Sequence, residues 1–257
     1  MELEELISKL VIGESLKELL DLVKSDVIIA GAGPAGLTAA KYLGDKGLRV
    51  VVLERRLSYG GGIGGGGNLF HKIVVDSKAL NILRDFKIRF KESEMKEYYV
   101  VDAAELMSKL ASGALDSGAK ILLGVEVEDL IVREDPFRVL GVMFKWSAIS
   151  IAGLHVDPLF MTARAVVDAT GHDAELLNIL IKKNKELGLN LKGEKSAYAE
   201  KAEKDVVEYT GRVLPGLYVA GMSVAALHGL YRMGPIFTGM LLSGKKVAEL
   251  IAKDLGV

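Results

Sequence analysis

Two histidines and an aspartate in the second half of the chain carry side chains that can bind a metal ion or move protons. His155 and Asp157 stand two positions apart, and His172 follows in the segment Ala169–Asp173. If His155 and Asp157 lie on an extended segment, their side chains face the same side. Imidazole and carboxylate groups are acceptable ligands for Fe(II), and imidazole also transfers protons near neutral pH. We therefore treat these three as candidate catalytic residues.

Purely structural roles for the same residues stay open from the sequence. His155 could be an ordinary strand histidine beside a turn, because the following Asp157–Pro158 is a common turn pair. Asp173 could cap a helix, with His172 beside it, since aspartate is favoured before a helix. Arg232, whose planar guanidinium suits a carboxylate, could pair with an acidic side chain at the surface. The choice depends on which side chains the fold brings together.

A glycine-rich turn near the N-terminus has the spacing of a phosphate-binding fingerprint. The segment Asp26–Gly36 is a short apolar run followed by Gly31, Gly33 and Gly36. In this pattern Gly31 allows a tight turn, Gly33 lets the backbone approach a pyrophosphate, and Gly36 lets the next helix sit close to the strand. The helix N-terminus adds unpaired N–H groups and a partial positive charge for the phosphates.

The acidic residue that completes this fingerprint is Glu54. It ends a second apolar run, Arg49–Leu53, at a position 18 residues beyond Gly36. A carboxylate there can bind both hydroxyls of a ribose and would repel a 2′-phosphate, although the neighbouring Arg55 and Arg56 weaken that repulsion. A glycine turn that served packing alone would leave Glu54 unexplained. We therefore predict that the chain binds a dinucleotide.

The elements that must position these residues follow an α/β pattern. A buried strand at Asp26–Ala30, a helix at Thr38–Leu43 and a buried strand at Arg49–Leu53 form a βαβ unit. We expect a single dinucleotide-binding domain over residues 1–257, with an N-terminal helix at about 1–24 and the Rossmann core from about 25. The remaining predictions are an amphipathic helix at Glu2–Val23, a helix at Ala103–Ser117, strands over Lys120–Val132, a strand pair at Val139–Trp146 and Ala148–Leu154, a strand at Ala163–Asp168, a charged loop at Lys182–Glu208 and a helix at Gly239–Leu255.

Composition limits the possible classes of function. The chain has 257 residues, a formal net charge of −1 and no cysteine. The near-neutral charge gives no electrostatic reason to expect nucleic acid or an anionic membrane as a partner. The lack of cysteine excludes disulfides, thiolate metal sites and a protein thiol nucleophile. The acidic N-terminus is unlike a signal peptide, and the apolar stretch Leu217–Tyr231 is too short to span a bilayer. We expect a cytoplasmic protein that acts on small molecules.

Two later motifs resemble those of glutathione-reductase-like flavoproteins. Val166–Gly171 is similar to the strand-to-loop motif of that class, and Gly216–Gly221 is similar to its late flavin motif. The resemblance implies an FAD/NAD(P)-binding Rossmann fold with an inserted β-rich region. A strand of that region commonly passes the adenine, so Val127 is expected to contact it through its backbone. The flavoproteins have an aspartate where this chain has Met222, which cannot accept the same hydrogen bond. This difference favours NAD over FAD.

Four segments together resemble the Thi4 family of thiamine thiazole synthases, over nearly the whole chain from about Asp26. They are Gly60–Phe70, Leu154–Pro158, Ala169–Asp173 and Gly229–Pro235. The resemblance implies conversion of NAD, glycine and a sulfur atom into an adenylated thiazole carboxylate, with release of nicotinamide. In some members a protein cysteine donates the sulfur, but here that position is His155. The chain is therefore similar to the archaeal members that use external sulfide and Fe(II) in repeated turnovers.

The same resemblance assigns roles to individual residues. It implies that Asp157 and His172 hold the metal, from neighbouring subunits in one arrangement, and that Arg232 binds the glycine carboxylate. His155 would contact the nucleotide or transfer protons, and Ala35 would contact it through its backbone. The family is usually octameric, so a homo-octamer is expected. The nucleotide contacts carried over are, in all, Gly31, Gly33, Ala35, Gly36, Glu54, Arg55, Gly62, Val127, His155 and Met222.

Three other functions are considered beside this one. An FAD-dependent oxidoreductase of the geranylgeranyl-reductase type would bind flavin, against which Met222 argues. A ribose 1,5-bisphosphate isomerase would need neither glycine nor sulfide. A nucleotide-sensing or partner-binding module would leave Asp157, His172 and Arg232 without a role. The thiazole synthase is the function that uses all of these residues.

Overall fold

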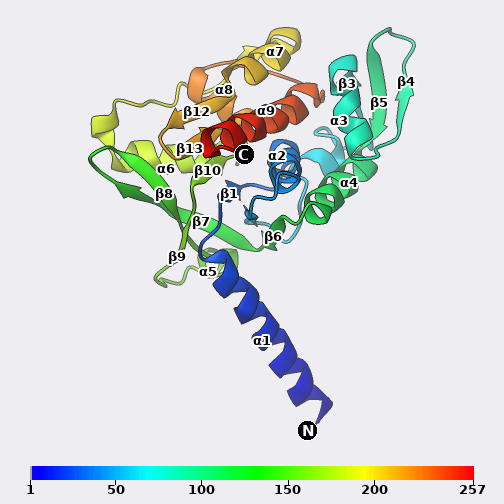
Figure 1. The fold of residues 1–257 in the computed structure, drawn as a ribbon. Helices are drawn as coiled ribbons and strands as arrows, with labels where there is room; N and C mark the ends of the chain where they lie inside the picture. The colour runs from blue at the N-terminus through cyan, green and yellow to red at the C-terminus, as the bar shows by residue number, and fades with distance from the viewer. Residues whose placement is uncertain (1) are drawn as a thin grey trace.

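The computed structural model describes residues 2–257 and contains a central sheet covered by helices (Figure 1). The helices are α1 (Leu3–Leu22), α2 (Pro34–Gly44), α3 (Leu80–Asp85), α4 (Ala103–Asp116), α5 (Ser147–Ile151), α6 (Glu175–Lys183), α7 (Ala199–Tyr209), α8 (Met222–His228) and α9 (Thr238–Leu255). Short 3₁₀ turns are η1 (Ile63–Gly65), η2 (Ser77–Ala79) and η3 (Lys185–Leu187). The strands are β1 (Val27–Ala30), β2 (Val50–Glu54), β3 (Lys72–Asp76), β4 (Phe90–Glu92), β5 (Tyr98–Asp102), β6 (Lys120–Leu123), β7 (Val125–Arg133), β8 (Arg138–Trp146), β9 (Leu159–Thr162), β10 (Ala165–Asp168), β11 (Lys195–Ala197), β12 (Gly211–Leu214), β13 (Leu217–Val219) and β14 (Tyr231–Arg232).

The central sheet has the strand order β12-β13-β10-β1-β2-β6. Every pairing in it is parallel except that of β12 with β13. Because β1 has β2 on one side and β10 on the other, the chain reverses its direction of winding at β1, and ligands of such sheets bind beyond the carboxyl ends of the strands. The expected glutathione-reductase-like Rossmann fold and its βαβ unit are confirmed.

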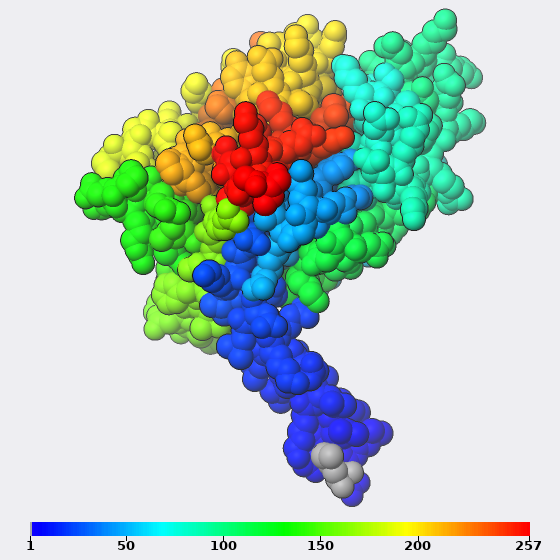
Figure 2. Space-filling model, viewed as in Figure 1, coloured from blue at the N-terminus to red at the C-terminus, as the bar shows by residue number. Residues whose placement is uncertain are grey.

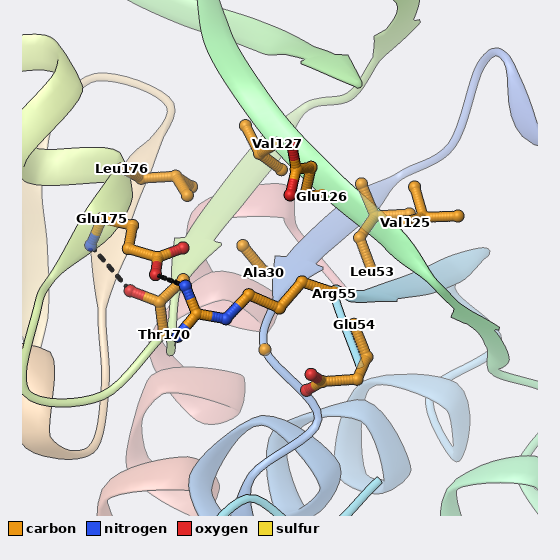
Figure 3. Close-up of a pocket in the computed structure, with 11 residues that line it drawn as sticks. Ala30, Leu53, Glu54, Arg55, Val125, Glu126, Val127, Thr170, Glu175 and Leu176 are labelled. Carbon is orange, nitrogen blue, oxygen red and sulfur yellow. Dashed lines mark hydrogen bonds and ion pairs between the residues drawn. The ribbon is translucent and has the colours of Figure 1, made fainter. Parts of the chain in front are cut away.

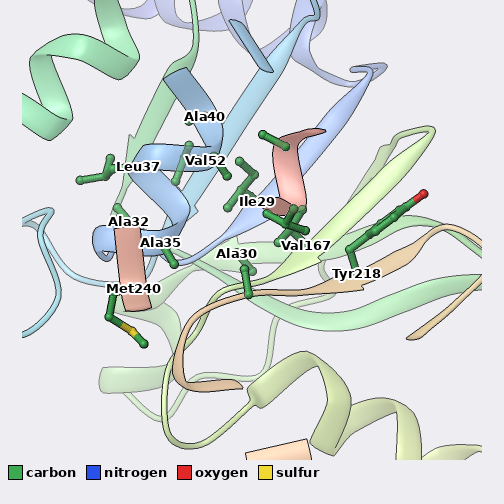
Figure 4. Close-up of a cluster of buried hydrophobic side chains, with 14 of the residues drawn as sticks. Ile29, Ala30, Ala32, Ala35, Leu37, Ala40, Val52, Val167, Tyr218 and Met240 are labelled. Carbon is green, nitrogen blue, oxygen red and sulfur yellow. The ribbon is translucent and has the colours of Figure 1, made fainter. Parts of the chain in front are cut away.

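The core lies between the central sheet and the helices α2 and α9. All residues of β1, β2 and β10 are buried, as expected for parallel strands that are covered on both faces. Figure 4 shows Ile29, Val52 and Val167 of these strands among the buried side chains. A Cβ atom added to Gly244 of α9 would lie 2.3 Å from the carbonyl oxygen of Ala35, so glycine allows α2 and α9 to pack closely.

Two three-stranded sheets form the inserted β-rich regions, β3-β5-β4 and β7-β8-β9. The predicted strands over Lys120–Val132 and Val139–Trp146 are confirmed as β6, β7 and β8. The predicted partner strand at Ala148–Leu154 is wrong, because Ser147–Ile151 forms α5. The edge of β8 that it would have occupied is taken by β9 in an antiparallel pairing.

The charged segment Lys182–Glu208 is not a simple loop. It holds the end of α6, the strand β11 and most of α7. Helix α7 buries Ala202 and Val206, which stand one turn apart on the side that packs against α9. Two small apolar residues among many charges give a stripe too narrow to stand out in the sequence, which explains the wrong prediction.

Helix α1 projects away from the rest of the molecule (Figures 1 and 2). The helix was predicted correctly, but its predicted amphipathic character is wrong, and Leu22 is its only residue that this chain buries. Leu10, Val11 and Ile12 follow one another, so at about 100° per residue the apolar side chains do not form a single stripe. Leu20 is 73% exposed. Within residues 2–257, no helix is both long and apolar enough to cross a membrane.

Candidate functional site

A cleft with a volume of about 580 Å³ lies beyond the carboxyl ends of the parallel strands. Six parts of the chain form its walls: the turn between β1 and α2, the end of β2, the glycine-rich loop at 61–67, the loop after β10, the turn between β13 and α8, and the segment from β14 to α9. It is lined by Gly31, Gly33, Pro34, Ala35, Glu54, Arg55, Arg56, Gly61, Gly62, Gly67, Ala169, Thr170, Gly171, His172, Asp173, Gly221, Met222, Arg232, Met233, Gly234, Pro235, Ile236, Phe237 and Met240. Residues far apart in the sequence therefore share one space.

The turn between β1 and α2 requires its glycines. Gly31 has φ of +101°, and a Cβ atom there would lie 2.4 Å from the carbonyl oxygen of Ala169. At Gly36 a Cβ atom would lie 2.1 Å from the carbonyl oxygen of Gly31. Gly33 and Gly62 differ, because a Cβ atom at either position meets no atom within 4 Å. The first pair serves packing, whereas Gly33 and Gly62 leave open space for a ligand in the cleft.

Glu54 is held in place by the backbone on both sides of it. One carboxylate oxygen accepts a hydrogen bond from the N–H of Ala32 at 2.9 Å, and the other accepts from the N–H of Arg56 at 2.9 Å. The residue is only 7% exposed but lines the cleft. Its carboxylate therefore keeps one orientation beside the glycine turn, with oxygen lone pairs left for further donors.

A small side cavity of about 50 Å³ adjoins the cleft (Figure 3). Val127 of β7 lines it together with Arg55 and Glu175, whose side chains form an ion pair. Burial raises the pKa of Glu175, and the Arg55 guanidinium opposes that rise. The N–H of Glu175 donates to Oγ1 of Thr170 at 2.7 Å, so the loop after β10 is tied to the start of α6. The structure thus places Val127 and Arg55 together beside Glu54.

Asp168, which the sequence offered only as part of a motif, organises the loop after β10. It is completely buried and accepts hydrogen bonds from Oγ1 of Thr170 at 2.7 Å and from Oγ of Ser223 at 3.0 Å. Its other oxygen accepts from the N–H of Leu177 in α6 at 3.0 Å. A buried carboxylate needs such donors to offset the loss of water. The position at a strand end before Thr170–Gly171 was the signal that could have identified it.

His172 stands at the rim of the cleft and contacts a glutamate. Its Nδ1 atom lies 2.5 Å from Oε1 of Glu194, while its side chain is 56% exposed. Asp173 lines the cleft next to it but forms no side-chain cap, since α6 begins after Ala174 without one. The capping role considered for Asp173 is therefore not found, and Glu194 is a residue that the sequence did not indicate.

Arg232 also lines the cleft, from the two-residue strand β14. Among residues 2–257 no carboxylate lies within ion-pair distance of its guanidinium. The surface ion pair considered from the sequence is not formed. Met222, at the start of α8, and Ala35, in α2, line the same cleft and are buried.

His155 and Asp157 are not among the residues that line the cleft. Both are exposed, on the connection between α5 and β9 that belongs to no helix or strand. Leu154 and Val156 beside them are exposed as well. Within the described part of the chain, no group of three or more histidine, aspartate or glutamate side chains is arranged to hold a metal ion. One chain therefore brings His172 and Arg232 to the cleft, but not Asp157.

Glu203 of α7 is a partly buried carboxylate that the sequence did not indicate. One of its oxygens accepts a hydrogen bond from the N–H of Gly239 at the start of α9, at 2.5 Å. The other, Oε1, is buried and has no hydrogen-bond partner in the residues that the structure covers. Burial raises the pKa of Glu203 to about 7, opposed by that hydrogen bond. This carboxyl group thus lies at the start of the helix that carries Met240 to the cleft.

Comparison with known proteins gives one consistent family. The Thi4 family model matches residues 8–237. The chain is 59% identical over 255 residues to the thiamine thiazole synthase of Pyrobaculum aerophilum, covering 99% of this chain and 97% of the relative. It is 58% identical over 253 residues to that of Archaeoglobus fulgidus, covering 98% and 96%. The crystal structure of Thermovibrio ammonificans THI4 is 42% identical, with a TM-score of 0.95 over 99% of this chain and 98% of that one.

Proposed function

The chain belongs to the Thi4 family, and we propose that it is a thiazole synthase of thiamine biosynthesis. In this proposal it converts NAD, glycine and external sulfide into an adenylated thiazole carboxylate and releases nicotinamide. The observation that carries the proposal is the shared cleft, where a phosphate-binding turn, Glu54, His172 and Arg232 face one space. A dinucleotide whose pyrophosphate binds at the turn would extend its second ribose, the one that carries nicotinamide, toward His172 and Arg232.

The shape of the turn supports a dinucleotide as the substrate. Open space at Gly33 and Gly62 suits a pyrophosphate, and the N-terminus of α2 presents backbone N–H groups nearby. The fixed carboxylate of Glu54 suits the hydroxyls of the adenosine ribose. The side cavity lined by Val127 lies where the adenine would continue. Met222 in place of the flavoprotein aspartate supports NAD rather than FAD.

The unpaired guanidinium of Arg232 supports binding of glycine. A planar guanidinium with two parallel N–H donors matches a carboxylate. Since Arg232 already lines the cleft and is not engaged by a carboxylate of residues 2–257, glycine would meet it without displacing another group. The glycine amino group would then lie free to condense with the carbonyl group of the opened ribose, where a C=N bond replaces the C=O bond and the oxygen leaves as water.

His172 fits the role of a metal ligand. Imidazole is an acceptable donor for Fe(II), and ligand histidines usually have the other ring nitrogen held by a carboxylate or carbonyl group. Fe(II), when bound, supplies Lewis-acid chemistry that polarises a carbonyl group and favours ionisation of sulfide. Asp157 lies outside the cleft of its own chain, so we propose that another copy in a homo-oligomer supplies it. A homo-octamer is the assembly that the family resemblance implies.

The composition supports an external sulfur source. The chain contains no cysteine, and His155 occupies the position of the sulfur-donating cysteine of other family members. Sulfur must then enter from solution, and each chain can complete more than one reaction.

Anaerobic incubation of the protein with NAD, glycine, sulfide and Fe(II), followed by mass spectrometry of the nucleotides, tests the proposal. We expect an adenylated thiazole only when all four are present. A ribose 1,5-bisphosphate isomerase would turn over its sugar phosphate without glycine or sulfide, and an FAD-dependent oxidoreductase would retain flavin absorbance after purification. Either of those results, together with no thiazole, contradicts the proposal.

A further inference from the structure

The ring of His172 is held by a residue 22 positions away in the sequence. Nδ1 of His172 lies 2.5 Å from Oε1 of Glu194, which places the two groups within hydrogen-bond distance. The Glu194 side chain is only 15% exposed, so its carboxylate has lost most of its water. Among residues 2–257 it forms no ion pair with a lysine or arginine. His172 is therefore the group that compensates the burial of Glu194.

Glu194 is fixed by the backbone on both sides of it. The N–H of Gly193 donates to the carbonyl oxygen of Ala226 at 3.0 Å, and the N–H of Lys195 donates to that of Leu230 at 2.8 Å. Strand β11 then runs parallel to β14, where Ala197 is paired with Arg232. The same two-stranded ladder thus sets both Glu194 and Arg232, and a shift in it would move both sides of the cleft.

We infer that Glu194 is a positioning residue that prepares His172 to bind the metal, an inference that rests on the proposed function. A carboxylate cannot donate, so the proton of this hydrogen bond belongs to Nδ1 of His172. The lone pair of the neutral ring is then on Nε2, the nitrogen left for a ligand in the cleft. Glu194 also restricts rotation of an otherwise exposed ring. Because Glu194 acts through His172, it contacts neither substrate nor metal.

Metal affinity separates this role from a merely structural one. Co(II) is titrated anaerobically into the full-length protein in its native assembly and followed by visible absorption. Removing the carboxylate partner of a ligand histidine typically weakens metal affinity roughly 10- to 100-fold. We expect that loss for Glu194→Gln, which keeps the size of the side chain but replaces one carboxylate oxygen by an amide group and removes the negative charge. We expect it also for Glu194→Asp, whose side chain is one methylene group shorter and does not reach Nδ1 of His172. The exposed Glu200→Gln is the matched control and should bind Co(II) like the unaltered protein.

His172→Ala separates the role of Glu194 from the role of His172 as metal ligand. If it loses Co(II) binding while both Glu194 variants keep the original affinity, the positioning role is wrong and the metal ligand stands. If His172→Ala keeps full affinity, the metal assignment of the proposed function is wrong, and the role of Glu194 falls with it. Thermal unfolding of each variant shows that it is folded, and the charge-conserving Glu194→Asp keeps the test decisive if Glu194→Gln unfolds.

Discussion

At the scale of single residues, the site depends on side chains whose orientation is fixed before any ligand arrives. Glu54 accepts from two backbone N–H groups, and Asp168 accepts from two hydroxyl groups and from backbone N–H groups. Arg232 is the exception, since it reaches the cleft without a carboxylate partner among residues 2–257. The fixed carboxylate of Glu54 suits the adenosine ribose of the proposed dinucleotide. The free guanidinium of Arg232 suits the carboxylate of the second proposed substrate, glycine.

Replacement of Glu54 tests the fixed group. In Glu54→Gln the amide nitrogen cannot accept, so the N–H of Ala32 or that of Arg56 loses its partner. The ribose hydroxyls also lose a charged acceptor, and a hydrogen bond to such a group contributes about 1.5–3 kcal/mol, so we expect NAD affinity to fall by roughly 10-fold or more. Isothermal titration with NAD measures it, and the exposed Glu94→Gln serves as control. Unchanged affinity in Glu54→Gln would remove Glu54 from the nucleotide site.

Replacement of Arg232 by lysine tests the free group. Lysine keeps the charge but loses the two parallel donors, so the KM for glycine should rise roughly 10-fold while the KM for NAD stays near its original value. Steady-state measurements with each substrate varied in turn give both constants. Arg138→Lys, at an exposed position of β8, should change neither. An equal rise in both constants would show that Arg232 does not act on glycine.

At the scale of elements, helix α9 packs against α2 and α7. These contacts fix the positions of Met240 in α9 and Ala35 in α2, which line the cleft. Gly244 sits at the crossing with α2, where a Cβ atom would lie 2.3 Å from a backbone oxygen. Gly244→Ala should therefore force the helices apart and lower the free energy of unfolding by about 1–3 kcal/mol. Gly13→Ala in α1 meets nothing within 4 Å and should be neutral or slightly stabilising. Chemical denaturation measures both, and equal effects would contradict this packing.

The contact of α9 with α7 includes Glu203, so the free energy of unfolding should depend on pH through this carboxyl group. Its pKa is raised to about 7 in the folded protein, from an ordinary value of 4.5. A raised carboxyl pKa means that the folded state holds the proton more tightly, so this contribution is complete below pH 4.5 and is lost as the pH rises to 7. Glutamine cannot ionise, so Glu203→Gln should not lose this contribution. The difference in free energy of unfolding between Glu203→Gln and the unaltered protein should therefore shift in favour of the variant between pH 5 and pH 8, by up to about 3 kcal/mol. Urea denaturation at both pH values measures it, and a pH-independent difference would show that Glu203 does not titrate there.

At the scale of the whole molecule, the proposed metal site would take residues from two chains. His172 lines the cleft, whereas Asp157 lies on an exposed connection outside it, and α1 exposes most of its apolar side chains. If Asp157 completes the cleft of another copy, then His172→Ala and Asp157→Ala should each abolish activity when expressed alone. Mixed oligomers formed by co-expression should regain part of it, because some sites then receive both intact residues. Mixtures as inactive as their parents would place both residues in one chain's site.

The sequence predicts the parts of this fold that depend on local patterns. The βαβ unit, the glycine turn and helix α9 follow from short segments whose residues are adjacent in the chain, and the structure confirms these elements. It also places Glu54 at the end of β2, as expected from the second apolar run. Helix α5 was predicted as a strand that pairs with β8. The strand that does pair there, β9, follows later in the sequence, and which of the two segments pairs with β8 depends on the tertiary structure.

The missed site residues have a similar cause. Glu194 reaches His172 only because β11 pairs with β14, and neither strand is long enough to leave a pattern. The spacing of Asp157 and His155 predicts only that their side chains lie on the same side of an extended segment. It does not predict where that segment lies in the fold, so the position of Asp157 outside the cleft had to come from the structure. Residues joined by long-range pairing therefore had to come from the structure.

The source of the sulfur atom decides whether this chain works as the proposed sulfide-dependent thiazole synthase. The purified protein is incubated anaerobically with NAD, glycine, Fe(II) and sulfide labelled with a heavy isotope, and the thiazole nucleotide is counted by mass spectrometry. Since the chain has no cysteine, every product molecule should carry the label, and the amount of product should exceed one molecule per chain. Unlabelled thiazole, or no thiazole with all four components present, would contradict this proposal.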